Sequence, residues 1–273
     1  MRGLLIRRCR GRHSRLEEKR IDCIHIFLFW YFFFYFSQIE EVSMVRIAIY
    51  SANFGRYRGE FATTKVDPYG RCGCLPSKEH CIDFFFFTDD PNVRLDHWNL
   101  IVMETLPSPV QGMSSFRHTA KYIKFVVPEI LHSYDIVVWI DNKSLSTFLP
   151  LNVTKLISLV DSKNRHRLCI VRHPSRSSPL EELQVTLALG FELKANGERF
   201  KETLRSMVFR TCLPDSTCMF FEMNAVNVYR LQKVYEALIH HGLQRDQNIL
   251  QYVWKMESME EDIVYFISSD IRS

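Results

Sequence analysis

The segment YDIVVWID at residues 134–141 decides how the chain folds, because five continuous apolar residues stand between acidic ones. An apolar run of this length is typical of a strand that is covered on both faces, as strands are in parallel sheets. Asp135 and Asp141 mark its two ends. The segment therefore predicts a central buried strand with the carboxylate of Asp141 at its tip.

Around this strand, short apolar runs alternate with longer amphipathic ones from Met44 onward. This alternation predicts an α/β fold with a mixed, mostly parallel sheet and helices on both faces. The predicted strands are residues 45–50, 82–87, 100–103, 136–140 and 168–171, and the predicted helices are residues 114–131, 153–161, 180–189, 198–209, 231–240 and 244–255.

Composition excludes several classes of protein. With 273 residues, 47% of them hydrophobic and 24% charged, the chain is globular and of a size for one large domain or two small ones. Residues 1–20 hold eight Arg or Lys and two Glu, so the remainder carries a net charge of −2 and predicts no nucleic-acid partner. Neither G-x-G-x-x-G nor G-x-x-x-x-G-K-[ST] occurs, which disfavours dinucleotide-binding dehydrogenases and P-loop NTPases.

The first 43 residues differ in character from the rest of the chain, since basic residues are followed by a short apolar run. Their apolar run at residues 24–36 would rise about 20 Å as a helix, short of the roughly 30 Å hydrocarbon core of a bilayer. Because Met44 directly precedes the strand-like VRIAIY, we expect the working protein to be cytoplasmic, with residues 1–43 as a non-native extension and residues 44–273 as one domain. The alternative is that the apolar run is a signal anchor, which would make the protein a type II membrane protein of the Golgi. Only in that case do we expect the protein to bind a membrane.

Polar residues follow three of the predicted strands, and ligands of open α/β sheets bind at the carboxyl ends of strands. A carboxylate such as Asp141 can hold Mn²⁺ or Mg²⁺, which would neutralise a diphosphate leaving group. It could instead cap the following turn. The polar groups after the strands are Ser51, Asn53 and Gly55, then Thr88, Asp89 and Asp90, then Asp141, Asn142 and Lys143.

Arg117, Lys121 and Lys124 are spaced to lie on one face of a helix. Such a stripe could face phosphates, with the guanidinium as a planar fork and the lysines as point charges. A charge triplet by itself is more often a solvated helix face.

His173 and Arg176 follow the fifth predicted strand, where they could grip sugar hydroxyls or phosphate. The start of a helix explains the neighbouring proline and the acidic pair at residues 181–182 equally well.

Two carboxylates are candidates for proton transfer. Asp246 opens the last predicted helix, where it could take a proton from an acceptor hydroxyl or merely offset the helix dipole. Glu222, with Asn224, is expected in the same cleft.

Taken in order, these pieces resemble a known family: the plant and microbial glycosyltransferase-like domain named for turgor-regulation-defect and mucilage-related proteins. The resemblance runs from about residue 47 to residue 255. The matching pieces are YSANFG at 50–55, DFFFFTDD at 83–90, WN at 98–99, the stripe of Arg117, Lys121 and Lys124, YDIVVWID at 134–141, HP at 173–174 with Arg176 and EE at 181–182, and RDQ at 245–247.

The resemblance implies a GT-A-like fold and transfer of a sugar from a nucleoside diphosphate sugar to a hydroxyl of a glycan or glycoconjugate. It implies that Asp141 is the counterpart of the D-x-D carboxylate, that residues 88–90 lie near the nucleotide with Arg245 also at the site, and that Asp246 faces the sugar or acceptor. The chain departs from D-x-D at Lys143, which could supply charge that a metal otherwise brings.

Two other functions stay open at this point. The same carboxylates could activate water, as in a ceramidase-like amidase or a nucleotide-sugar hydrolase. The chain could also be a non-catalytic sugar-binding or nucleotide-binding relative, since fold alone does not fix a reaction. Asn142 begins an N-glycosylation sequon, and a glycan there would obstruct the proposed site, which favours a cytosolic protein.

Overall fold

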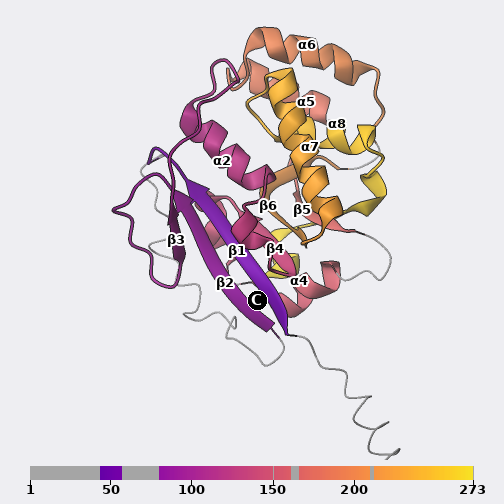
Figure 1. Cartoon of the computed structure of the whole chain (residues 1–273). Helices are drawn as coiled ribbons and strands as arrows, with labels where there is room; N and C mark the ends of the chain where they lie inside the picture. The colour runs from indigo at the N-terminus through magenta and orange to yellow at the C-terminus, as the bar shows by residue number, and fades with distance from the viewer. Residues whose placement is uncertain (1–43, 57–79, 150, 161–165, 210–211, 273) are drawn as a thin grey trace, which may run out of the picture. The chain divides into compact units, whose positions relative to one another are not determined.

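The computed structural model describes residues 44–56, 80–149, 151–160, 166–209 and 212–272 (Figure 1). Residues Met44–Ser273 form one unit by their internal contacts. The interpretations of residues 1–43, as an extension or as an anchor, lie outside the described part. Within the described part, every helix is too short or too polar to cross a bilayer.

Seven strands form one sheet, in the order β3-β2-β1-β4-β6-β5-β7. All of them run in one direction except β6, which is antiparallel to both of its neighbours. This arrangement confirms the predicted mixed, mostly parallel sheet. The strands are β1 (Val45–Asn53), β2 (His80–Thr88), β3 (Asn99–Val102), β4 (Ile136–Ile140), β5 (Leu168–Arg172), β6 (Pro214–Glu222) and β7 (Ile263–Phe266).

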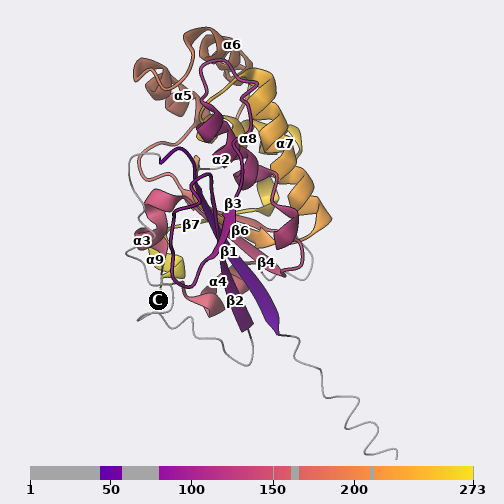
Figure 2. The ribbon, with the colours of Figure 1, turned by 60° about the vertical axis from the view of Figure 1, so that its left-hand side comes forward.

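Helices cover both faces of the sheet, as the sequence predicts. One face packs against α2 (Ser115–Phe125), α5 (Pro179–Ala188), α6 (Lys194–Arg205), α7 (Ala225–His241) and α8 (Gln247–Met256). The other packs against α3 (Leu145–Phe148), α4 (Val153–Val160) and α9 (Ser268–Ile271), and Figure 2 shows α3 and α9 next to each other. The short helices are η3 (Glu129–Leu131), η4 (Asn142–Ser144) and η5 (Glu260–Asp262).

The central strand β4 explains the continuous apolar run. Val137 and Trp139 pack into the core beneath α2 and α7, whereas Val138 and Ile140 pack into the core on the opposite face. All five residues of β4 are buried, because side chains alternate between two covered faces. β4 therefore ends directly before Asp141, and a shift of its register by one residue would exchange the side chains on its two faces.

Several helix predictions differ from the structure at their ends, and the helix predicted over residues 231–240 is α7, which already begins at Ala225. The helix predicted over residues 114–131 is α2, which ends at Phe125 because Pro128 lies just beyond and a short separate turn follows. The helix predicted over residues 198–209 is α6, which begins at Lys194 and passes through Gly197. A Cβ on Gly197 would lie 2.5 Å from a methyl carbon of Leu187, so this glycine permits the contact between α5 and α6.

Strands β6 and β7 are not among the predicted elements, and the direction of β6 matters for the site. β1, β2, β4 and β5 end at one edge of the sheet, which we call the carboxyl edge, and β6 begins there. Ile140 at the end of β4 pairs with Cys218, whereas Ile136 at its start pairs with Glu222. Residues at the end of β6 consequently lie at the opposite edge.

Candidate active site

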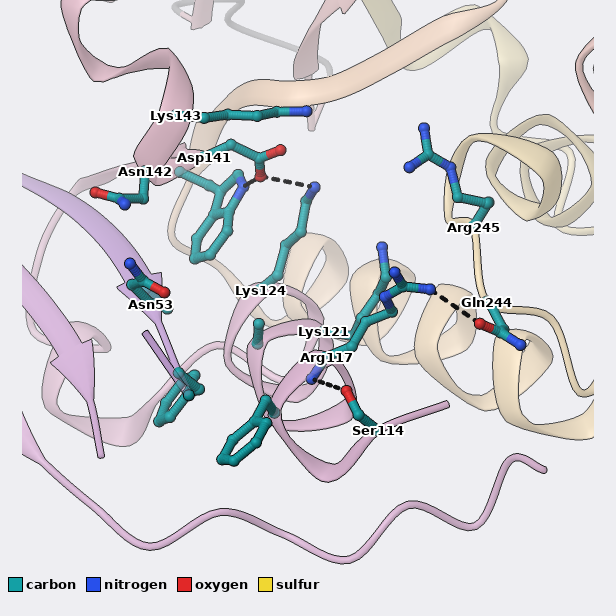
Figure 3. A pocket seen from close by; sticks show the side chains of 16 residues that line it. Asn53, Ser114, Arg117, Lys121, Lys124, Asp141, Asn142, Lys143, Gln244 and Arg245 are labelled. Atoms are coloured by element: carbon teal, nitrogen blue, oxygen red, sulfur yellow. Dashed lines mark hydrogen bonds and ion pairs between the residues drawn. The ribbon is translucent and has the colours of Figure 1, made fainter. Parts of the chain in front are cut away.

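A cavity of about 250 Å³ opens at the carboxyl edge, between the ends of β1 and β4 and one face of α2 (Figure 3). Its volume is near the lower end for small-molecule sites, which run from roughly 300 to 1,000 Å³. Its lining residues are Ala52, Asn53, Phe54, Gly55, Ser114, Phe116, Arg117, Ala120, Lys121, Lys124, Trp139, Asp141, Asn142, Lys143, Gln244 and Arg245.

Helix α2 delivers the predicted cationic stripe to this cavity. Ser114 caps the helix by accepting a hydrogen bond from the N–H of Arg117 at 3.3 Å. Arg117, Lys121 and Lys124 all line the cavity, and Figure 3 shows Lys124 pointing from the helix toward Asp141. The stripe is therefore not a solvated helix face.

A buried carboxylate lies beneath the two lysines. Asp246 accepts hydrogen bonds from Lys121 Nζ at 2.6 Å and Lys124 Nζ at 2.8 Å, and the Ser216 hydroxyl donates to it at 2.6 Å. Asp246 is only 3% exposed to solvent. Burial acts to raise the pKa of Asp246, but the two ammonium groups outweigh it and hold that pKa well below the ordinary value.

This geometry does not favour the predicted role of Asp246 as a base. A carboxylate that is buried, held by two cations and resistant to protonation is poorly suited to accept a proton from a substrate. Asp246 instead holds Lys121 and Lys124 in place. The sequence shows its position at a helix start, but the partners are 125 and 122 residues away.

The pKa values of the two lysines move in opposite directions. Burial lowers the pKa of Lys121, and the like charge of Lys124 adds to that effect while Asp246 opposes it. Burial also acts to lower the pKa of Lys124, but the attraction of Asp141 and Asp246 outweighs it, so that this pKa is raised. Lys124 therefore carries the more persistent charge.

Asp141 lies at the tip of β4, as predicted, and in the cavity. Its N–H donates to the Thr217 carbonyl at 2.8 Å. Its Oδ1 accepts hydrogen bonds from Trp139 Nε1 at 2.8 Å and from Lys124 Nζ at 3.4 Å. Asp141 directly precedes η4, but its side chain makes no capping hydrogen bond. The alternative prediction, that Asp141 caps the following turn, is therefore wrong.

The residues around Asp141 do not fit the predicted Mn²⁺ or Mg²⁺. One carboxylate together with substrate phosphates can hold Mg²⁺, so the number of ligands alone does not decide. Charge decides, because Lys124 is bonded to the same carboxylate and Lys143 lines the same cavity. Among the described residues, no group of three or more His, Cys, Asp and Glu side chains could hold a metal ion.

The turn between α7 and α8 closes the cavity. Gly242 ends α7 with a positive φ of 64°. The buried carboxylate of Glu192 then accepts the N–H groups of Gln244 and Arg245, each at 2.7 Å. Arg117 donates to Gln244 Oε1 at 2.9 Å. Sequence reasoning missed Gln244, although it adjoins the Arg245 and Asp246 pair, and no local signal marks Glu192.

The polar groups after β2 support the site without lining it. Gly55 N–H donates to both carboxylate oxygens of Asp89, at 2.9 and 3.1 Å. Asp90 accepts from Arg56 Nε at 2.9 Å, and its N–H donates to Thr88 Oγ1 at 3.1 Å. These residues, predicted to bind the nucleotide, hold the loop that follows β1.

The predicted residues at the end of β1 and directly after it divide in a similar way. Asn53 and Gly55 line the cavity, whereas Ser51 is fully buried and does not. After β4, Asn142 and Lys143 line it beside Asp141, as predicted.

His173 and Arg176 lie outside this cavity. His173 Nδ1 accepts the N–H groups of Ser175 at 3.2 Å and Arg176 at 3.0 Å, and the Arg176 guanidinium forms an ion pair with Glu182. Ser178 caps α5 just beyond. The structure thus supports the helix-start interpretation of this segment.

Glu222 is a further correction. It is exposed and pairs with Ile136, at the start of β4, so it lies at the edge opposite to Asp141. The prediction placed Glu222 and Asn224 in the cleft, but β6 runs antiparallel to its neighbours and ends at the opposite edge of the sheet.

Comparison with known proteins gives structural likenesses only. No known protein family and no curated protein matches the sequence. Among solved structures, the apo form of mouse xyloside xylosyltransferase 1 matches with a TM-score of 0.45 and 10% identity, over 82% of this chain and 85% of that one. The apo bifunctional glycosyltransferase WbbM matches with a TM-score of 0.43 and 13% identity, over 82% of this chain and 39% of that one.

Proposed function

We propose that this protein is a glycosyltransferase that moves a hexose or pentose from a nucleoside diphosphate sugar to a hydroxyl of a glycan or glycoconjugate. The observation that carries the proposal is the charge of the cavity. Five cations and the carboxylate of Asp141 line it, and the buried carboxylate of Asp246 pairs with two of these cations, which leaves a net charge of +3. Guanidinium and ammonium groups in this number suit a diphosphate. The groups are Arg117, Lys121, Lys124, Lys143 and Arg245, with Asp141 and Asp246.

The same charge favours the departure of the sugar. When the bond between the sugar C1 and the β-phosphate oxygen breaks, the oxygen keeps the electron pair and the diphosphate gains negative charge. Cations bind the leaving group more strongly than the intact donor, and this difference lowers the barrier. Because Asp246 already holds Lys121 and Lys124, little reorganisation is needed during the reaction.

The cavity also suggests the orientation of the donor. Its end near β1 is uncharged, and Phe116 there is 42% exposed, so a nucleoside base could stack on its ring. The diphosphate would then lie over the cations. The sugar would lie near Asp141, whose carboxylate could accept a hydrogen bond from a sugar hydroxyl or offset positive charge on the ring.

We further propose that the cationic side chains take the part of a metal ion. Lys124 is bonded to Asp141 where a divalent cation would sit, and Lys143 replaces the second carboxylate of a D-x-D sequence. Transfer then consists of attack by the acceptor oxygen on C1, departure of the nucleoside diphosphate and loss of the acceptor proton to solvent.

Calorimetric titration with nucleoside diphosphates and their sugars tests this proposal. We expect Lys143→Ala to weaken diphosphate binding about tenfold. Lys143 is exposed and has no ion pair with another described residue, so its loss should leave the fold intact. Lys155→Ala, an exposed lysine on α4, is the matched control. Equal affinities of all three proteins, or no binding by a folded wild type, would contradict the proposal.

Turnover separates the alternatives. A hydrolase should consume the donor at full rate without an acceptor, and a binding protein should bind the donor without consuming it. A transferase should release nucleoside diphosphate in step with the glycosylated product. Product analysis by mass spectrometry therefore distinguishes the three functions once a bound donor is known.

A further inference from the structure

A second cavity, of about 620 Å³, opens at the same carboxyl edge. It lies over the ends of β5 and β7, the start of β6 and the turn after β4. Lys143 lines both cavities, so the two are neighbours across one side chain. The lining residues are Lys143, Ser144, Thr147, Phe148, Val171, Arg172, His173, Pro174, Asp215, Thr217, Ile267 and Ser268.

The chemistry of the second cavity differs from that of the first. Four hydroxyl side chains line it together with apolar groups, among them Ile267, which is 51% exposed. Hydroxyls with one carboxylate and one guanidinium can exchange hydrogen bonds with sugar hydroxyls, and apolar surface can cover the C–H faces of a sugar ring. The second cavity therefore suits a carbohydrate better than a diphosphate.

Asp215 is the carboxylate of this cavity. Its Oδ1 accepts hydrogen bonds from the Thr217 N–H at 3.1 Å and Gln247 Nε2 at 3.4 Å. These bonds fix the side chain at the start of β6, beside the edge where β4 ends. A fixed carboxylate can accept a hydrogen bond from a ligand hydroxyl and so orient its oxygen.

Besides Lys143, two cationic or ionisable groups line the same cavity. The Arg172 side chain makes no hydrogen bond or ion pair with another described residue, so its guanidinium can bind a ligand. His173 is different, because its Nδ1 accepts two backbone N–H groups and its Nε2 lies 4.0 Å from Glu182. The Arg172 side chain is thus able to turn toward a ligand, whereas the His173 ring is held in place as part of the cavity lining.

We infer that the second cavity binds the carbohydrate acceptor, with Asp215 orienting the acceptor hydroxyl toward the first cavity past Lys143. The inference rests on the proposed function, because it places the second substrate of that reaction. Asp246 and Glu222 do not serve here, since one is buried under lysines and the other lies at the opposite edge. His173 then belongs to the acceptor cavity.

Saturation-transfer NMR with methyl glycosides of common hexoses and pentoses tests the inference directly. We expect at least one glycoside to bind the wild type, and we expect Thr147→Trp to weaken that binding about tenfold or more by filling the cavity. Thr147 is exposed on α3, so a larger side chain there should not disturb the core. Thr154→Trp, at an exposed position of α4, is the matched control.

A second variant reports on Asp215. Asp215→Asn keeps the shape and an oxygen for the Thr217 N–H but removes the charge. We expect weaker glycoside binding and, once donor and acceptor are known, a KM for the acceptor raised about tenfold with the KM for the donor unchanged. Asp96→Asn, at an exposed loop position, is its control.

The outcomes separate this inference from the proposed function. Glycoside binding that is insensitive to Thr147→Trp and Asp215→Asn would overturn the acceptor site, as would the absence of binding by every glycoside. Nucleoside diphosphate titration of Thr147→Trp should match the wild type, and Asp215→Asn should bind the diphosphate at least as tightly as the wild type. A wild type that binds a glycoside in this cavity but no diphosphate would refute the transferase and leave a carbohydrate site.

Discussion

At the scale of single residues, the buried Asp246 has the largest predicted effect on stability. Asp246→Asn removes the negative charge beneath the two lysines, which leaves the buried ammonium group of Lys124 with Asp141 alone and the partly buried one of Lys121 without an ion pair. Breaking a buried ion pair from one side costs about 3–5 kcal/mol, and we expect the free energy of unfolding to fall by that amount. Ser216→Ala removes one hydrogen bond to the same carboxylate and should cost about 1–2 kcal/mol. Urea unfolding at pH 7 measures both, and equal effects would contradict this account.

A second residue-scale prediction concerns alkaline pH. Burial lowers the pKa of Lys121, so as the pH rises this lysine loses its proton before an ordinary lysine does. Affinity for a nucleoside diphosphate should therefore begin to decrease at a pH below the range in which ordinary lysines lose their proton, because one cation is lost from the cavity. Lys121→Arg keeps the charge and should move the fall to higher pH. Titrations from pH 7 to pH 10 decide this, and identical profiles would rule out Lys121 as the group responsible.

At the scale of elements, the loop after β1 depends on a glycine. Gly55 has a φ of +65°, and a Cβ there would lie 2.5 Å from the ring of Phe116. Gly190 has a similar φ of +69° with open space around it. Gly190→Ala should thus lower the free energy of unfolding by about 1–2 kcal/mol, because only the left-handed backbone conformation is unfavourable for alanine there. Gly55→Ala should lower it by more, because the added Cβ also meets the ring. Unfolding measurements compare the two, and Phe116→Ala should partly rescue the Gly55 variant if the ring is the obstacle.

The elements also show what a sequence can predict. Five strands and six helices follow from apolar periodicity, and three cations spaced at i, i+4 and i+7 reach one cavity because a helix repeats every 3.6 residues. The direction of β6 is not encoded in any local pattern, since it is set by pairing with β4 and β5 far along the chain. Glu222 lies at the end of β6, so its position at the opposite edge follows from this long-range pairing. The role of Asp246 likewise depends on lysines from a distant helix.

At the scale of the whole molecule, the fold gathers segments from residue 52 to residue 268 at one edge of the sheet. Lys143 stands between a strongly cationic cavity and one rich in hydroxyls. The parallel strands supply the turns that line both, and the reversed β6 brings Asp215 to the same edge. A two-substrate reaction needs such an arrangement, because its reacting atoms must meet within a few ångströms.

The charge of the cavity leads to a last prediction, on Asp141 and metal. If the cations alone bind the donor, chelation with EDTA should not change diphosphate affinity, and Asp141→Asn should raise it by removing a negative charge. The amide oxygen of the variant can still accept from Trp139 Nε1, so the site should keep its shape. If Asp141 instead holds Mn²⁺ or Mg²⁺, both EDTA and Asp141→Asn should weaken binding, and added metal should restore only the wild type. Diphosphate titrations of the wild type and Asp141→Asn, with and without Mn²⁺, decide between the two, because the affinity of the variant should rise in the first case and fall in the second.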